Sequence, residues 1–354
     1  MKVTALAMVL VFVSFPLNVR AAGQTDTVSK AAQNCSVDQI RELLRTDTLE
    51  PFILPCSATL SSDARVTRQV IIEGSAASAT TFNCNGAVLD GSGLPESSEV
   101  AQLLVRSKPT TGIWDRPSDV TIQNCRFLGS AKVYGLGLSG NAKRVRESSL
   151  NADHTNFAQA SAPTRILFSN VIFETTGRLP LYLAPGVTAV TVRDSSFIGR
   201  VRTVAIYLDA ESAGNRIEGN VFEISSEKRE LIAVDGSANN IIQRNTFSHV
   251  KNGGVFLYRN CGEGGTIRHQ TPHGNLISGN LFVIEGGKPA VWLNSRNGNS
   301  NFCFIDPKHP FGSSLSSLDY AKNNTVVKNV VVGAGSFSIK NNDPSNVVAN
   351  NVFE

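Results

Sequence analysis

The chain has 354 residues, of which 41% are hydrophobic and 18% are charged, and its formal net charge at pH 7 is +4. So small a charge over this length gives no argument for nucleic-acid binding, and the sequence contains no nucleic-acid-binding motif. The six cysteines include no CxxC spacing, which argues against a structural zinc site.

The first residues have the pattern of a secretory signal peptide over 1–21. Lys2 precedes an apolar run at 3–17, and small side chains at Val19 and Ala21 fit a cut after Ala21. The run is shorter than the about 20 apolar residues that a membrane span needs, and the alternative is an uncleaved N-terminal anchor. Cleavage would lower the formal charge to +2, because it removes Lys2 and Arg20 and no acidic residue. We expect a periplasmic or secreted protein with no membrane span.

The cysteine count indicates disulfides, because an exported chain matures in an oxidising compartment and an even number of cysteines remains after cleavage. Fifteen pairings of six cysteines are possible in principle. Proximity along the sequence favours three pairs: Cys35–Cys56, Cys84–Cys125 and Cys261–Cys303.

The segment 22–64 precedes the repeats and contains one helical pattern, "SVDQIRELLR" at 36–45. Ser36 is a suitable N-cap, and one helical face carries the apolar residues Val37, Ile40, Leu43 and Leu44. We expect a short helix that covers the open N-terminal end of a repeat core, because such a core otherwise exposes apolar side chains and unpaired strands.

From 65 to 354 one motif recurs. It reads "VTIQNCRFLG" at 120–129, "VTVRDSSFIG" at 190–199, "NRIEGNVFEI" at 215–224 and "NIIQRNTFSH" at 240–249, and it fades through "NVVANNVFE" at 346–354. Each unit has two short runs of alternating apolar residues and then a third run, such as "VAIYLDAES". Three short strands in each unit of about 25 residues predict an all-β right-handed parallel β-helix of about 9–10 coils.

Asparagines recur between the first and second run of the units. They are Asn124, Asn170, Asn220, Asn245, Asn280 and Asn329. We interpret them as one internal ladder of hydrogen bonds between coils, and therefore as structural residues.

The repeats resemble those of the pectin-lyase-like superfamily of right-handed parallel β-helices, over roughly residue 65 onward. The resemblance implies the fold, and it implies binding of polysaccharide along the outer face of one parallel sheet. It does not select an activity, because one fold hosts many chemistries. The sequence lacks the DPH tripeptide of mannuronan epimerases, and "NADH" at 151–154 is only distantly similar to the NTD motif of polygalacturonases.

The third run of each unit places alternate residues on the outer face of its sheet. The expected first column is Gly137, Tyr182, Tyr207, Ala233, Phe256, Trp292 and Ser338, and the second is Ser139, Ala184, Asp209, Asp235, Tyr258, Asn294 and Lys340. Sugar rings stack on aromatic faces, so we expect substrate to contact the aromatic residues of the first column, which are Tyr182, Tyr207, Phe256 and Trp292. The alternative is that loops cover these aromatic residues.

Three long insertions leave the same edge of this sheet, at 139–164, 258–274 and 294–323. Long loops in a repeat protein are often functional, so we expect them to form a cleft beside the aromatic column. A Cys261–Cys303 disulfide would join two of these loops and hold Arg259, Arg268 and His269 in place.

The first chemistry that we expect is β-elimination or C5 epimerisation of a uronic-acid polymer. Its requirements are a cation at the sugar carboxylate and a group that moves a proton. The candidates for the cation are Arg259, Arg268, Lys288 and Arg296, with Asn294 beside them, and the candidates for proton transfer are Tyr258 and His269. Asp209, Glu211 and Asp235 could hold Ca²⁺.

Two alternatives remain open. In glycoside hydrolysis, Asp209 and Asp235 would be the acid and the base or nucleophile. In non-catalytic binding, both would be ordinary turn residues at strand ends. In all three cases we expect a monomer whose partner is an acidic polysaccharide, with neither the polymer nor its linkage identified.

Overall fold

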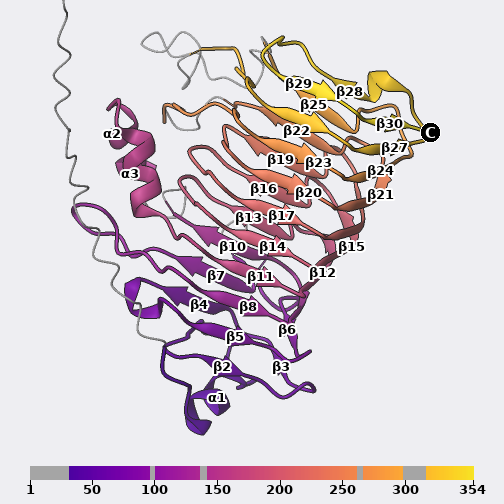
Figure 1. Cartoon of the computed structure of the whole chain (residues 1–354). Helices are drawn as coiled ribbons and strands as arrows, with labels where there is room; N and C mark the ends of the chain where they lie inside the picture. The colour runs from indigo at the N-terminus through magenta and orange to yellow at the C-terminus, as the bar shows by residue number, and fades with distance from the viewer. Residues whose placement is uncertain (1–31, 96–99, 136–141, 261–265, 298–315) are drawn as a thin grey trace, which may run out of the picture. The chain divides into compact units, whose positions relative to one another are not determined.

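The computed structural model describes residues 32–95, 100–135, 142–260, 266–297 and 316–354. Within these residues, three parallel sheets of ten strands each form a β-helix, as predicted. Each coil contributes one strand to each sheet in turn, and each strand pairs only with its counterparts in the neighbouring coils (Figure 1). The expected number of coils is confirmed.

The sheets are named here in the order in which the chain enters them. Sheet 1 contains β1 (Phe52–Ile53), β4 (Val70–Glu73), β7 (Leu103–Arg106), β10 (Ala131–Tyr134), β13 (Leu181–Leu183), β16 (Ile206–Leu208), β19 (Ile232–Asp235), β22 (Val255–Tyr258), β25 (Val291–Leu293) and β28 (Ile339–Lys340). Sheet 2 contains β2 (Ala58–Thr59), β5 (Thr81–Asn83), β8 (Thr121–Gln123), β11 (Leu167–Ser169), β14 (Thr191–Arg193), β17 (Arg216–Glu218), β20 (Ile241–Gln243), β23 (Leu276–Ser278), β26 (Thr325–Val327) and β29 (Val347–Ala349). Sheet 3 contains β3 (Arg65–Val66), β6 (Val88–Asp90), β9 (Arg126–Leu128), β12 (Ile172–Gly177), β15 (Ser196–Val201), β18 (Val221–Ser226), β21 (Thr246–Val250), β24 (Leu281–Ile284), β27 (Val330–Val332) and β30 (Val352–Phe353).

The interior of the coils is built from stacked side chains of the same type. A column of fully buried phenylalanine rings runs along sheet 3, formed by Phe127, Phe173, Phe197, Phe222, Phe247 and Phe282. The distances between the centroids of successive rings are 5.0, 4.9, 4.6, 4.5 and 4.7 Å. Burial of each ring contributes about 1.5–3 kcal/mol, which gives every coil its own share of the core.

Asparagines form two internal ladders instead of the one predicted. The first is Asn220, Asn245, Asn280, Asn329 and Asn351, and the second is Asn215, Asn240, Asn275, Asn324 and Asn346. From the second asparagine of each ladder onward, the side-chain carbonyl accepts from the backbone N–H and the side-chain amide of the asparagine one coil earlier. The first carbonyls, those of Asn215 and Asn220, accept from backbone N–H groups of the preceding coil. The ladders therefore satisfy buried backbone donors at two turns of every coil that they cross.

The prediction was wrong for Asn124 and Asn170, which do not belong to either internal ladder. The register of sheet 2 places them level with Gly219, one residue before the ladder position. Their φ angles are 55° and 53°, a left-handed conformation that asparagine adopts more readily than most residues. The Asn170 side chain donates to Asn124 Oδ1 at 2.8 Å on the more exposed side of the turn.

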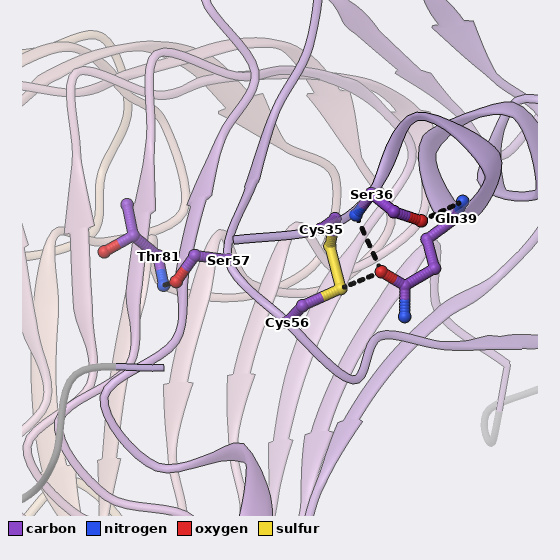
Figure 2. The surroundings of a disulfide bond; sticks show 6 residues. All are labelled: Cys35, Ser36, Gln39, Cys56, Ser57 and Thr81. Atoms are coloured by element: carbon purple, nitrogen blue, oxygen red, sulfur yellow. Dashed lines mark hydrogen bonds between the residues drawn. A yellow bond between two sulfur atoms is a disulfide. The ribbon is translucent and has the colours of Figure 1, made fainter. Parts of the chain in front are cut away.

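The predicted N-terminal helix is α1 (Val37–Leu43), and Ser36 caps it through a reciprocal pair of hydrogen bonds with Gln39. The Cys35–Cys56 disulfide ties the residue before this N-cap to the chain that leads into β2 (Figure 2). Leu43 is buried, as expected, whereas Val37 is 75% exposed and does not belong to the buried face.

Three further differences concern the ends and the insertions. The β-helix begins at β1 and not at residue 65, because two short strands already pair with the next coil. The insertion at 139–164 contains two helices, α2 (Ala142–Ser149) and α3 (His154–Ser161), which the sequence did not predict. Short 3-10 turns occur at Ser75–Ala77 and Ser336–Ser338.

Two of the predicted disulfides are confirmed, Cys35–Cys56 and Cys84–Cys125, and they fit a protein that matures in an oxidising compartment. Cys261, Cys303 and the predicted signal peptide lie outside the described residues. No helix in the described part of the chain has the length and apolar character needed to cross a membrane.

Candidate functional site

The outer face of sheet 1 carries the predicted aromatic column over four coils and one gap. Strand pairing aligns Tyr182, Tyr207, Ala233, Phe256 and Trp292. Phe256 is 7% exposed, while both tyrosines and the tryptophan are half-buried. A ligand could therefore reach only part of each ring. The column is neither fully open to substrate nor fully covered by loops.

The ends of both predicted columns were wrong. Lys132 precedes Tyr182 in the first column and Lys340 follows Trp292, so Lys340 does not belong to the second column and Ser338 belongs to neither. In the coil that contains Lys132, the strand of sheet 1 is β10, "AKVY", and it lies before the glycine-rich run from which the first residue of each column was predicted. Gly137 and Ser139 lie outside the described residues.

The central part of the second column is confirmed, and it brings two aspartates together. Asp235 pairs with Tyr258, and Asp209 follows Leu208 directly at the end of β16. Asp235 is fully buried and Asp209 is 7% exposed.

Arg268 lies between the two carboxylates. The same guanidinium nitrogen, Nη1, is 3.0 Å from Asp209 Oδ1 and 2.8 Å from Asp235 Oδ2. Burial raises the pKa of the Asp209 carboxyl, Arg268 opposes this rise, and the neighbouring Asp235 adds to it. The cation is what allows two carboxylates to share so small a buried space.

A tyrosine hydroxyl binds each aspartate. Tyr182 donates to Asp209 Oδ2, and Tyr207 donates to Asp235 Oδ2 at 2.5 Å. Burial and the adjacent carboxylates hold the pKa of both phenols well above their usual value, so both are protonated at neutral pH. Asn260 completes the shell of Asp235, donating its backbone N–H at 2.7 Å and its side-chain amide at 2.8 Å.

Two further arginines, Arg229 and Arg296, lie at the tyrosine rings beside these aspartates. Arg229 donates to the Tyr258 hydroxyl and forms an ion pair with Glu230 at 2.8 Å, and its side chain is 26% exposed. Its guanidinium carbon lies 5.5 Å from the ring centroid of Tyr207. The Arg296 guanidinium carbon lies 4.0 Å from the ring centroid of Tyr258, which is close enough for a cation–π contact.

Tyr258 itself is fully enclosed, and its hydroxyl donates to Glu230 Oε1 at 2.8 Å. Burial, together with Tyr207 and Glu230, raises its pKa well above the usual value. The Tyr258 hydroxyl therefore has no direct access to solvent in this arrangement, as the predicted transfer of a substrate proton would require.

Arg259 and Asn294 face away from the aspartates. The Arg259 guanidinium donates to the backbone carbonyls of Ser316 at 3.3 Å and Leu318 at 3.0 Å. Asn294 exchanges hydrogen bonds with the backbone of Ala321. Both residues fix the segment in which the third insertion returns to the coil, and neither guanidinium nor amide reaches the Arg268 cluster.

Asp319 is a buried carboxylate of that returning segment, 1% exposed. It accepts the backbone N–H groups of Arg259 at 3.0 Å and Arg296 at 2.9 Å. Burial raises its pKa to about 6, although these hydrogen bonds lower it. Asp319 therefore positions the backbone at Arg296, where the third insertion begins.

Glu211 and His269 join the first two insertions to the coils. Glu211 accepts from Thr155 Oγ1 at 2.5 Å and from the backbone N–H of His269 at 2.7 Å, and its own φ angle is 59°. His269 Nε2 lies 2.7 Å from the carbonyl of Ser149, and its ring packs on that of His154 at 5.4 Å. Figure 1 shows α2 and α3 beside the coils at this level.

This geometry bears on the expected metal ligands. Within the described residues, Asp209, Glu211 and Asp235 do not gather into a group that could hold a metal ion. The physical reason is that Arg268 occupies the space between the aspartates, while Glu211 is directed at N–H and O–H donors of α3 and the second insertion. The donor set therefore does not fit Ca²⁺.

Lys288 also lies apart from the cluster. It is exposed in the turn before β25, at the opposite end of that strand from Arg296. A hollow of about 390 Å³ lies instead over α2 and α3, lined by Arg144, Glu147, Ser148, Asn151, Asp153, His154 and Phe157. Parts of the second and third insertions lie outside the described residues.

Comparison with known proteins places the chain in a family. A family model described as a right handed beta helix region matches residues 111–302. The chain belongs to this family. No curated protein matches the chain.

Solved structures similar to this β-helix protein include three of different kinds. The Dettilon tailspike protein is 13% identical with a TM-score of 0.33, over 80% of this chain and 55% of the tailspike chain, so the match spans about half of that protein. PfbA, a surface adhesin of Streptococcus pneumoniae, is 11% identical with a TM-score of 0.36, over 89% and 86% of the two chains. A mannuronan C-5 epimerase A-module of Azotobacter vinelandii is 13% identical with a TM-score of 0.28, over 91% and 96%.

Sequence reasoning about this β-helix protein missed Arg229, Glu230 and Asn260, which contact Tyr258 or Asp235, and also Asp319 of the returning segment. Asn260 was within reach of prediction, because it follows the strand end that carries Tyr258. The other three come from turns whose path depends on how the chain returns to the coil, and no local pattern marks them.

Proposed function

We propose that this β-helix protein is exported, binds an acidic polysaccharide on the outer face of sheet 1, and transfers a proton at a uronate residue, as a lyase or a C5 epimerase does. The supporting observation is the position of Arg229 and Arg296, two partly exposed guanidinium groups held against the rings of Tyr207 and Tyr258. Guanidinium groups bind carboxylates, and half-buried aromatic rings bind the C–H faces of sugars.

The chemistry follows from the two tyrosine–aspartate pairs. Neutralisation of the uronate carboxylate by an arginine makes its C5 proton more acidic. In elimination a base removes that proton, the C4–O bond breaks, a C4–C5 double bond forms and the leaving oxygen gains a proton. Tyr182 and Tyr207 have ring centroids 5.8 Å apart on neighbouring coils, and each carries an aspartate that can accept the phenolic proton. One pair acts as the base and the other as the acid.

Epimerisation uses the same first step, after which a proton returns to C5 from the other face and no bond to the polymer is broken. Hydrolysis is a poorer fit. Arg268 Nη1 contacts both aspartates, so its guanidinium fills the space that a sugar ring would need between an acid and a nucleophile.

Non-catalytic binding is a second candidate, and one observation favours it. Asp235 is fully buried, and both of its oxygens already accept hydrogen bonds from Asn260, Tyr207 and Arg268. A saturated network of this kind suits a rigid binding face as well as it suits proton transfer.

The test uses the mature protein with polygalacturonate, alginate and hyaluronate. Elimination gives an ultraviolet absorbance from the unsaturated uronate, and epimerisation in D₂O gives deuterium at C5. We expect one of these signals with one polymer, reduced at least about 100-fold in Tyr207→Phe, since general acid–base groups contribute about 10²–10⁴-fold. Tyr320→Phe removes a hydroxyl from the third insertion and is the matched control. Binding of a polymer without either signal would support the non-catalytic candidate, and binding of no acidic polymer would overturn the proposal.

A further inference from the structure

The turns that lead from sheet 3 into sheet 1 carry a row of basic side chains, here called the basic edge. Its members lie on four successive coils: Arg200 near the end of β15 and Arg202 directly after that strand, Lys228 after β18, Lys251 after β21 and Lys288 before β25. All five are exposed. The pairing of sheet 3 places these turns on neighbouring coils, with a shift of register between β21 and β24.

These five cations differ from several exposed arginines of the coils. Elsewhere, arginines at the turns are paired with carboxylates, as in Arg165–Asp119 at 2.6 Å and Arg216–Glu218 at 2.9 Å. No side chain of the basic edge forms an ion pair or a hydrogen bond with another residue that the structure describes. Their charge is therefore left uncompensated by the coil itself.

Few acids share these turns. Glu230 is buried against Arg229, so the exposed acids at these turns are Glu227 and Glu285, and Glu285 lies 2.7 Å from His249. A net positive potential therefore runs along one side of the outer face of sheet 1. Arg229 leaves the same turn as Lys228, and its side chain reaches the ring of Tyr207. The edge is thus continuous with the aromatic column.

The spacing of the row defines the ligand that it fits. Neighbouring coils of a parallel sheet are about 4.8 Å apart, and the row advances by one coil at a time. A pyranose unit in an extended chain advances by a similar distance. A polymer laid along the coil axis would therefore bring one anionic group to each successive turn only if nearly every sugar carried one.

We infer that the basic edge binds a continuously charged anionic polysaccharide, which runs parallel to the coil axis from the level of β15 to the level of β25. The inference rests on the proposed function, and it adds the direction of the chain and the density of its charge. Polymers with isolated acidic groups, or with esterified carboxylates, leave most of the row unmatched and bind more weakly.

The experiment compares two triple variants with the same change in net charge. Lys228→Gln/Lys251→Gln/Lys288→Gln removes three cations of the edge, and Arg193→Gln/Arg244→Gln/Lys328→Gln removes three from the turns between sheets 2 and 3. Binding of polygalacturonate, highly methyl-esterified pectin, anionic phosphatidylserine vesicles and single-stranded polynucleotide is measured by calorimetry over a range of salt concentrations.

We expect the edge variant to bind polygalacturonate at least about tenfold more weakly than the wild type at low salt, and the difference to vanish at high salt, because exposed charges are screened. The control variant should bind within about twofold of the wild type, and esterified pectin should bind weakly to all three. Equal losses in both variants, or none in the edge variant, would overturn the inference while the proposed function stands if Tyr207→Phe still abolishes turnover. Preference for vesicles or polynucleotide would overturn the polysaccharide ligand, and failure of every anionic polysaccharide to bind would overturn both proposals.

Discussion

Replacement of Arg268 by methionine is the sharpest test of the cluster on sheet 1. Arg268 is 9% exposed and holds Asp209 and Asp235 through one nitrogen. Methionine keeps most of the volume and removes the charge, so two buried carboxylates would face each other without a cation. Removal of one partner from a buried ion pair costs about 3–5 kcal/mol. We expect a loss of that size at pH 7.

The loss should depend on pH in a definite direction. Without Arg268, the pKa of the Asp209 carboxyl rises further, because burial and the neighbouring Asp235 disfavour its charged form and the opposing cation is gone. A group whose pKa is raised on folding stabilises the folded state below that pKa, and the stabilisation is lost as the pH rises through it. Arg268→Met should therefore be closer in stability to the wild type at pH 4 than at pH 7.

Thermal unfolding followed by circular dichroism between pH 4 and pH 8 measures both effects. The double variant Arg268→Met/Asp235→Asn should recover part of the stability at pH 7, since it leaves one carboxyl and not two. A destabilisation below about 1 kcal/mol at pH 7, which is the size expected for a surface ion pair, would refute the reasoning. So would a destabilisation that is the same at every pH.

Two more predictions test neighbouring features. Asp319 has a pKa of about 6 against a usual 3.8, so it stabilises the fold below about pH 4, and that contribution of about 3 kcal/mol is lost as the pH rises through 6. Asp319→Asn removes the titrating group and one of its two backbone hydrogen bonds, so it should flatten the dependence of the unfolding temperature on pH between pH 4 and 7. An unchanged slope would contradict the buried carboxylate. Asn245→Ala should cost about 2–4 kcal/mol, because it removes the acceptor of two buried N–H groups of Asn220; amide exchange should increase at Asn220, and unchanged exchange there would argue against the ladder.

The fold was predictable because every coil repeats the same physical problem. Apolar residues at every second position, with a phenylalanine at 25-residue intervals, can be buried only by stacking like on like, and the observed register aligns Phe197, Phe222 and Phe247. The predicted register of sheet 1 was correct where polar and apolar residues alternate strongly, as at Ile206 and Leu208. It was wrong at the coil with β10, where glycine-rich sequence alternates equally well in the wrong frame.

The site was predictable only in part, for a reason that also bears on its chemistry. Stacking of Asp209 on Asp235 follows from the coil and could be derived. Whether that stack is a pair of free carboxylates, a metal site or an ion-pair cluster is decided by what the insertions bring to it, and the second insertion brings Arg268. The coil thus fixes positions and the insertions fix protonation and charge. Arg268 neutralises the aspartates, whereas the guanidinium groups of Arg229 and Arg296 lie at the rings of Tyr207 and Tyr258. This is why the proposed function follows the arginines and tyrosines more closely than the aspartates.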